Sequence, residues 1–162
     1  MEEKNNSSEK SNLIQLVSFK IGTEEFGVDI LKVQEINKLV QITKVPNAPY
    51  FVEGVINLRG RIIPIVDLRT RLGLPRKDFD KNTRIVVIDL HGKTIGFIVD
   101  AVNEVLRISN DIIEPPPTIS KGVNADYITS VAKLEDRLLI LLDLEKLLSE
   151  EEKEKLAEAV NS

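Results

Sequence analysis

Residues Gly54–Leu72 read GVINLRGRIIPIVDLRTRL, and this stretch decides the fold. Two aliphatic runs, VINL and IIPIV, flank the tetrapeptide Leu58-Arg59-Gly60-Arg61. Two short apolar runs joined through a glycine are typical of a β-hairpin. The arginines beside the glycine leave four interpretations open: a catalytic loop, a nucleic-acid contact, a simple turn, or a surface that docks another protein.

The same pattern occurs a second time, 76 residues later. Ser130–Leu148 reads SVAKLEDRLLILLDLEKLL, and six of its nineteen positions are identical to those of the first stretch. Upstream, Phe26-Gly27-Val28 corresponds to Ile95-Gly96-Phe97 at an offset of 69, and Val33-x-Glu35 corresponds to Val102-x-Glu104. We call residues related by either offset repeat mates. The chain therefore contains two related halves, at about 13–74 and 83–148.

Each half is about 65 residues long, with about five short strands. Units this small bury little core of their own. We therefore expect the two halves to pack together, and the barrels they form are candidates for strand exchange.

The duplication also serves as an internal control for function. Arg61 and Asp67 are identical to their repeat mates, so we interpret them as structural, the first flanking a turn and the second capping the next one. Arg59 corresponds to Glu135, so a hairpin forms there without the arginine. We therefore expect Arg59 to face outward, toward a binding partner.

Short apolar runs separated by Gly and Asp turn signals predict a mainly β protein, built as small barrels or a sandwich. The ten predicted strands are Leu13–Ile21, Glu25–Val28, Val33–Leu39, Gly54–Leu58, Ile62–Val66, Arg84–Leu90, Thr94–Val99, Val102–Ile108, Thr129–Lys133 and Leu138–Leu142.

Helix is sparse in this sequence. Pro49–Glu53 and Leu68–Leu72 are predicted to form single turns. Ser149 is followed three residues later by Glu152, the spacing of a capping box, which predicts a short C-terminal helix within 149–162. The polar residues 1–12 are expected to be a disordered tail.

Composition excludes several classes of function. The chain of 162 residues contains no Cys and one His, so disulfides, thiolate metal sites and Cys nucleophiles are excluded. His91 precedes a glycine between two strands, which is typical of an exposed turn residue. No nucleotide-binding or hydrolase motif is present, and we expect neither enzymatic activity nor a cofactor. No apolar run approaches the ~20 residues of a membrane span, and the N-terminus has no signal core, so we expect a cytoplasmic protein.

Charge is distributed unevenly along the chain. Residues 59–84 contain eight basic and three acidic residues, a net charge of +5, whereas residues 134–158 contain four basic and nine acidic residues, a net charge of −5. A small barrel with a basic patch is compatible with nucleic-acid binding, but two Tyr and five Phe offer few stacking platforms and the whole chain is at −4. The alternatives are two solvated faces or opposite poles that orient protein partners.

Four stretches carry a resemblance to a known family. EEFGVDILKVQEI, VPNAPYFVEGVINLRGRIIPIVDLRTRLG, GFIVDAVNEVLRI and LLILLDLEKLL are similar to the CheW-like family of bacterial chemotaxis adaptors, over roughly Leu13–Leu148. The resemblance implies two packed SH3-like five-stranded β-barrels. It also implies a non-catalytic scaffold that joins the histidine kinase CheA, through a regulatory domain of the same fold, to the cytoplasmic tips of methyl-accepting chemoreceptors at the membrane.

The resemblance also implies where partners bind. An apolar groove between the barrels involves Ile30, Val33 and Val102, and weaker candidates are Val17, Ile36 and Val99. The alternative for these residues is that they belong to the core. The family further implies partner contacts for Arg59 and Glu35. The repeat supports Arg59, but it does not support Glu35, because Glu104 matches it.

A CheW-like domain also occurs joined to a receiver domain in CheV. This sequence has no room for a receiver or an ATP-binding domain, so we expect the stand-alone adaptor. An adaptor for a non-flagellar chemosensory array stays open, since no residue separates it from flagellar chemotaxis.

Overall fold

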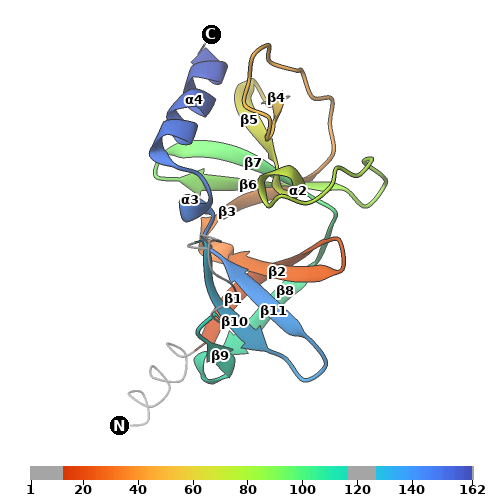
Figure 1. Ribbon diagram of the computed structural model, residues 1–162, viewed down its shortest axis with the longest axis vertical. Helices are drawn as coiled ribbons and strands as arrows, with labels where there is room; N and C mark the ends of the chain where they lie inside the picture. The colour runs from red at the N-terminus through yellow and green to blue at the C-terminus, as the bar shows by residue number, and fades with distance from the viewer. Residues whose placement is uncertain (1–12, 117–126, 162) are drawn as a thin grey trace.

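The computed structural model describes residues 13–116 and 127–161. The tail expected at 1–12 lies outside the described residues. Two β-sheet units are stacked along the long axis of the molecule, and the C-terminal helix lies beside the upper unit (Figure 1). The described part of the chain is mainly β, as the sequence predicts.

The ten predicted strands are present in the predicted order, but the helical turn predicted at Pro49–Glu53 does not form, because its last two residues already belong to the strand Val52–Leu58. The bounds of the strands and helices are β1 (Leu13–Ile21), β2 (Glu24–Asp29), η1 (Ile30–Lys32), β3 (Val33–Lys38), β4 (Val52–Leu58), β5 (Arg61–Asp67), α2 (Leu68–Arg71), β6 (Arg84–Leu90), β7 (Lys93–Val99), β8 (Ala101–Ser109), η2 (Asn110–Ile112), β9 (Ile113–Glu114), β10 (Ile128–Lys133), β11 (Leu138–Leu142), α3 (Leu144–Leu147) and α4 (Glu150–Asn161).

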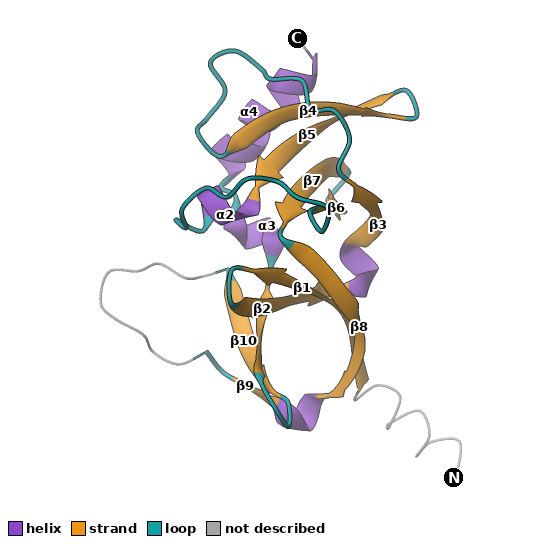
Figure 2. Ribbon diagram, turned by 90° about the vertical axis from the view of Figure 1, so that its right-hand side faces the viewer, coloured by secondary structure: helices purple, strands orange, loops and turns teal. Residues whose placement is uncertain are grey.

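Each sheet contains strands from both halves of the chain. The order in the first sheet is β8-β1-β2-β11-β10-β9, and we call it the terminal barrel. The order in the second is β3-β6-β7-β5-β4, and we call it the central barrel. Figure 2 shows the terminal barrel as a ring of strands below the central one. The mate of each central strand stands at the same place in the terminal barrel, so the duplication seen in the sequence is also present in the topology.

The register of the strands repeats as well. Leu141 of β11 lies opposite Gly27 of β2 in a parallel pair, and their repeat mates Ile65 and Gly96 form the parallel pair of β5 and β7. Parallel neighbours within such short units require long connections. Between β2 and β11 the chain passes through the whole central barrel, whereas between β5 and β7 it passes through α2, residues 72–83 and β6. The exchange of strands therefore ties the two barrels together.

Three apolar clusters form the core. One lies inside the central barrel and one inside the terminal barrel. The third and largest lies between the barrels and receives side chains from both sheets and from the C-terminal helices. Its most buried members include Val17, Phe19, Ile21, Val66, Ile88, Phe97, Val99 and Leu147. The cluster between the barrels therefore provides the buried apolar surface that each small barrel lacks on its own.

The hairpin of the opening sequence closes through a tight two-residue turn. Leu58 and Arg61 pair, so Arg59 and Gly60 form the turn, with φ of 54° and 85°. Positive φ at both positions is the mark of a type I′ turn, which matches the twist of the flanking strands. The side-chain oxygen Oδ1 of Asn57 accepts a hydrogen bond from the Gly60 amide at 2.8 Å. Arg59 thus occupies the turn itself, and Arg61 begins the next strand.

The identical repeat mates have structural roles, as predicted. Asp67 and Asp143 are the N-caps of α2 and α3, where each carboxylate accepts a hydrogen bond from a backbone amide two residues later. Arg61 donates to Thr94 at 3.0 Å, and its mate Arg137 donates to Glu25, the mate of Thr94, at 2.7 Å.

The C-terminal helix begins at the predicted capping box. Ser149 and Glu152 exchange hydrogen bonds between side chain and backbone at 2.8 and 3.1 Å. Leu156 is 2% exposed and packs into the cluster between the barrels. Among the described residues, no helix is long and apolar enough to cross a membrane.

Candidate partner-binding surface

The edge strands β3 and β8 each present two aliphatic side chains toward the outside of the seam between the barrels. On β3 these are Val33 and Ile36, and on β8 they are Val102 and Val105. We call these four residues the edge-strand strip. Each β3 member is the repeat mate of the β8 member at the same place. In Figure 2, β3 and β8 lie on the same side of the molecule, with the short η1 turn between them.

Two of the four residues of the edge-strand strip are exposed, and the other two are partly buried. Ile36 is 38% exposed and Val105 is 53% exposed. Val33 and Val102 are partly buried and pack against the cluster between the barrels, as does Ile30 of η1. The strip is therefore an apolar surface anchored on the largest core, with its outer members available for contact.

Val17 and Val99 lie elsewhere. Each is 1% exposed and belongs to the cluster between the barrels. Their side chains lie in the cluster between the barrels, which leaves them almost no accessible surface. The structure thus places them in the core rather than in a groove, and they are not part of the strip.

Val105 was missing from the residues expected from the sequence. It follows a bulge in the pairing of β1 with β8, which shifts the alternation of side chains along the strand. The signal that could have found it is the offset of 69, because Ile36 was a candidate and Val105 is its repeat mate.

Glu35 of the edge strand β3 forms an ion pair with Arg59 of the β4–β5 turn. The guanidinium Nη2 of Arg59 is 2.5 Å from Oε2 of Glu35, which joins the β4–β5 turn to β3. Hydrogen bonds from Arg59 and from Asn37 hold the pKa of Glu35 below its usual value. The Arg59 side chain is 71% exposed, so this pair contributes little to folding and its outer face can contact a partner.

The equivalent pair in the terminal barrel uses a different arginine. Glu104, the repeat mate of Glu35, accepts a hydrogen bond from Arg137 at 3.2 Å, and Arg137 is the mate of Arg61 rather than of Arg59. Both barrels therefore join this edge glutamate to a hairpin arginine. The contact of this glutamate is thus common to both halves, and Arg59 is the position that differs between them.

The basic segment 59–84 is largely neutralised within the protein. Five of its cations form ion pairs. Four of them pair with carboxylates outside the segment: Arg59 with Glu35, Arg69 with Asp100, Arg71 with Glu152 and Arg76 with Glu53, and Lys77 pairs with Asp80 inside it. Paired cations release fewer counterions when they meet a phosphate backbone, so this segment is a poor candidate for a nucleic-acid interface.

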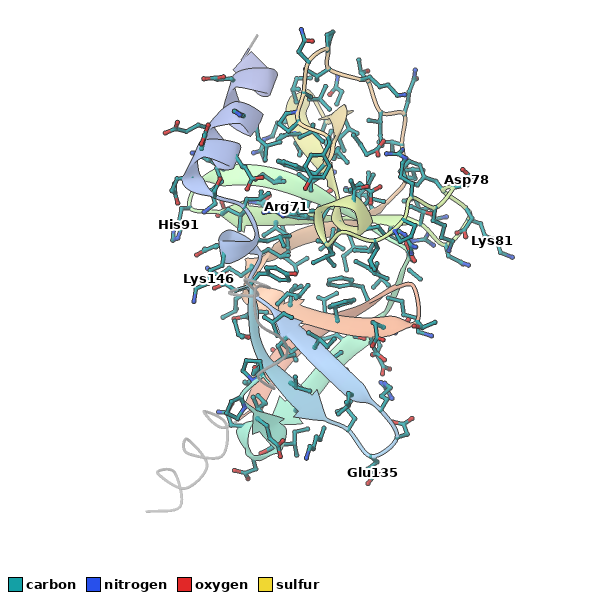
Figure 3. All side chains as sticks on the ribbon, viewed as in Figure 1. Arg71, Asp78, Lys81, His91, Glu135 and Lys146 are labelled. Atoms are coloured by element: carbon teal, nitrogen blue, oxygen red, sulfur yellow. The ribbon has the colours of Figure 1, made fainter. Side chains whose placement is uncertain are left out.

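The single histidine of the chain lies at the surface. His91 occupies the turn between β6 and β7, and its side chain is 78% exposed and 3.1 Å from Glu145. Figure 3 shows it pointing away from the body of the molecule. Residues 13–116 and 127–161 contain no group of His, Cys, Asp and Glu that could hold a metal ion.

Comparisons with known proteins agree with this architecture. The profile of the CheW-like domain matches residues 15–152. A chemotaxis protein CheW of Klebsiella aerogenes is 42% identical over 138 residues, which covers 85% of this chain and 83% of that protein. A chemotaxis protein CheW of Bacillus subtilis is 34% identical over 140 residues, which covers 85% of this chain and 88% of that protein.

A solved structure shows the same fold. The scaffolding protein TtCheW from Thermoanaerobacter tengcongensis is 39% identical and superimposes with a TM-score of 0.78, covering 86% of this chain and 94% of that chain. A chemotaxis protein CheV3 of Helicobacter pylori is also similar, at 32% identity over 161 residues, but the match covers only 52% of that longer protein.

Proposed function

Because this chain belongs to the CheW-like domain family, we propose that it is a non-catalytic adaptor that couples the histidine kinase CheA to methyl-accepting chemoreceptors in bacterial chemotaxis. It acts in the cytoplasm and is recruited to receptor arrays at the membrane. The observation that carries the proposal is the edge-strand strip, whose paired aliphatic residues lie beside the exposed Arg59–Glu35 ion pair.

The strip suits the helical tip of a receptor. A helix presents apolar side chains three and four residues apart along one face, and such a face buries itself against exposed aliphatic residues. Ile36 and Val105 are the most exposed members of the strip and would be its central anchors. Arg59 offers a planar set of donors to carboxylates or backbone carbonyls at the edge of that contact.

The kinase would bind elsewhere, through its regulatory domain of the same fold, at one end of a barrel. An adaptor that holds receptor and kinase together transmits a signal by favouring one of two kinase states. The size of that effect is set by the difference in contacts between the two states. No group in the adaptor needs to react.

Reconstitution tests the proposal directly. Kinase autophosphorylation is measured with CheA alone, with CheA and a receptor fragment, and with this protein added. We expect receptor control of the rate only when all three are present. Receptor control without this protein, or no control with it, would refute the adaptor role.

Two substitutions test the surface. Val105→Lys places a charge in the strip and should weaken receptor binding about tenfold or more. Leu138→Lys is the matched control, because Leu138 is 59% exposed on the terminal barrel but lies outside the strip. Equal losses from both variants would show that the strip is not the contact.

Arg59→Glu tests the ion pair on β3. The fold should be retained, because the guanidinium is exposed and the mate of Arg59 is already a glutamate, whereas binding to receptor or kinase should fall. Circular dichroism and a pull-down with each partner separate the two effects. An unfolded variant would assign Arg59 to the fold instead.

A further inference from the structure

A cavity of about 370 Å³ opens where the terminal barrel meets α3 and β6. Its walls are mostly aliphatic, with a rim of charged and polar groups. The residues that the argument uses are Leu16, Leu141, Asp29, Lys32, Asp143 and Glu145. No member of the edge-strand strip is among the described lining residues, so the cavity is separate from the proposed receptor contact.

The core of the central barrel receives an additional side chain from a loop of the chain itself. The mates of Leu16 and Leu141 are Ile85 and Ile65, which form part of the core of the central barrel. There, Phe79 packs against that core from the segment that joins α2 to β6. An aromatic side chain thus completes the interior of one barrel.

The terminal barrel has no equivalent of that segment. After α2 the chain runs through residues 72–83 before β6 begins, whereas α3 ends at Leu147 and α4 already begins at Glu150. Leu58 also packs against the core of the central barrel, and its mate Leu134 packs against the core of the terminal barrel in the same way. Neither residue related to Phe79 by the two offsets, Leu148 or Lys155, is part of the described cluster inside the terminal barrel, and the cavity opens on Leu16 and Leu141 of that cluster.

The filling segment also brings a cation to a pair of carboxylates. Arg76 forms an ion pair with Glu53, and the hydrogen bond and charge of Glu53, together with the charge of Asp67, raise the pKa of Arg76. Arg76 and Phe79 stand three residues apart in this segment. A single loop therefore gives the central barrel both an aromatic side chain, Phe79, and a paired cation, Arg76.

The rim of the open cavity carries a matching charge. Asp143 is the mate of Asp67, and it lines the cavity together with Asp29 and Glu145. Lys32 is the one cation among the described lining residues, so the formal charge of the rim is −2. The hydrogen bond with Glu145 at 2.9 Å, with further contributions from Asp143 and Asp29, raises the pKa of Lys32.

We propose that this cavity binds a segment of a partner protein that carries Lys or Arg and, three residues later, Phe or a comparably large apolar side chain. The apolar side chain packs against Leu16 and Leu141, as Phe79 packs against the core that contains their mates Ile85 and Ile65. The cation lies at the carboxylates of the rim. The site adds a second anchoring point to the adaptor, beyond the surface proposed for receptors.

A peptide copied from the loop that carries Arg76 and Phe79 tests the proposal. A synthetic peptide with the sequence of residues 73–83, GLPRKDFDKNT, is titrated into the full-length protein labelled at Ile, Leu and Val methyl groups. We expect chemical-shift changes at Leu16 and Leu141. Replacing the residue equivalent to Phe79 by Ala in the peptide should weaken binding about tenfold or more, because a large buried apolar side chain is lost.

Two results would overturn the proposal. One is the absence of shifts at peptide concentrations up to about millimolar, where even a weak site would be occupied. The other is a set of shifts confined to Ile65 and Ile85, which would show that the peptide only competes with its own loop in the central barrel.

A protein variant tests the rim. Glu145→Arg reverses one charge, and its repeat mate is already Arg69, so the fold tolerates a cation at this place in the other half. We expect severalfold weaker binding of the peptide. Glu24→Arg is the matched control, because Glu24 lies in the same barrel but not at the cavity, and it should leave affinity unchanged. Equal losses would attribute binding to net charge and overturn the site.

Discussion

Replacing Gly54 with alanine tests the backbone geometry that supports the Arg59 hairpin. Gly54 has φ of 148°, a conformation that residues with a side chain rarely adopt. An added Cβ would lie 2.1 Å from the carbonyl oxygen of Thr43. That oxygen accepts a hydrogen bond from Val55 at 2.8 Å, and the Thr43 amide donates back to the Val55 carbonyl at 2.9 Å. Thr43 can therefore move away only by breaking this bridge.

The expected loss of stability follows from these contacts. The unfavourable φ costs about 1–3 kcal/mol, and the clash or the broken bridge about 1–3 kcal/mol more. The lower entropy of alanine in the unfolded chain returns about 0.4–1 kcal/mol. We expect Gly54→Ala to lower the free energy of unfolding by about 3 kcal/mol.

Urea unfolding followed by circular dichroism measures this difference. Ser130 is the repeat mate of Gly54, it follows the same irregularity of pairing, and it already carries a Cβ. Ser130→Ala is therefore the control and should stay within about 1 kcal/mol of the wild type. A Gly54→Ala protein equally close to the wild type would refute the argument from φ and from Thr43.

Three further perturbations have expected outcomes. Gly96→Ala should destabilise by about 1–2 kcal/mol and more than its mate Gly27→Ala in urea unfolding, because its Cβ would lie 2.6 Å from the nearest side-chain atom rather than 3.2 Å; the reverse order would contradict the packing. Burial raises the pKa of Glu25, but hydrogen bonds from Ser18 and Arg137 outweigh it and hold the pKa below 4.5. The wild type should therefore be more stable than Glu25→Gln near pH 6, and the difference should shrink as the pH falls through the lowered folded pKa; a gap that does not change with pH would count against it. Burial raises the pKa of the Asp67 carboxyl, so its ionised form costs stability at neutral pH, and Asp67→Asn, which keeps a capping oxygen, should unfold at the same or higher urea concentration there; a large loss would show that the charge is needed.

Much of the fold could be predicted from the sequence because the chain repeats itself. The offsets of 76 and 69 relate strands that occupy equal places in the two barrels. Among the residues identical in both copies, Asp67 and its mate Asp143 proved to be helix N-caps. The sequence predicted ten strands, and the described structure adds β9, which has only two residues and too short an apolar run to be recognised.

The candidate site was harder to predict. The seam strands are apolar on both faces, because Leu16 of β1 points into its own barrel while Val17 points into the cluster between the barrels. Alternation of side chains therefore could not separate a core valine from an exposed one. The contact of Arg59 with Glu35 depends on how the barrel closes between its two edges, and no local pattern in the sequence records that closure.

The exchange of strands also bears on how the chain is made. Ser18 near the start of the chain pairs with Glu104, and Phe26 pairs with Ile140. On the ribosome, β1 and β2 emerge first but must wait for almost the whole chain before their barrel can close. The central barrel needs nothing beyond β7 and can form earlier, offering its apolar face as a template for the waiting hairpin.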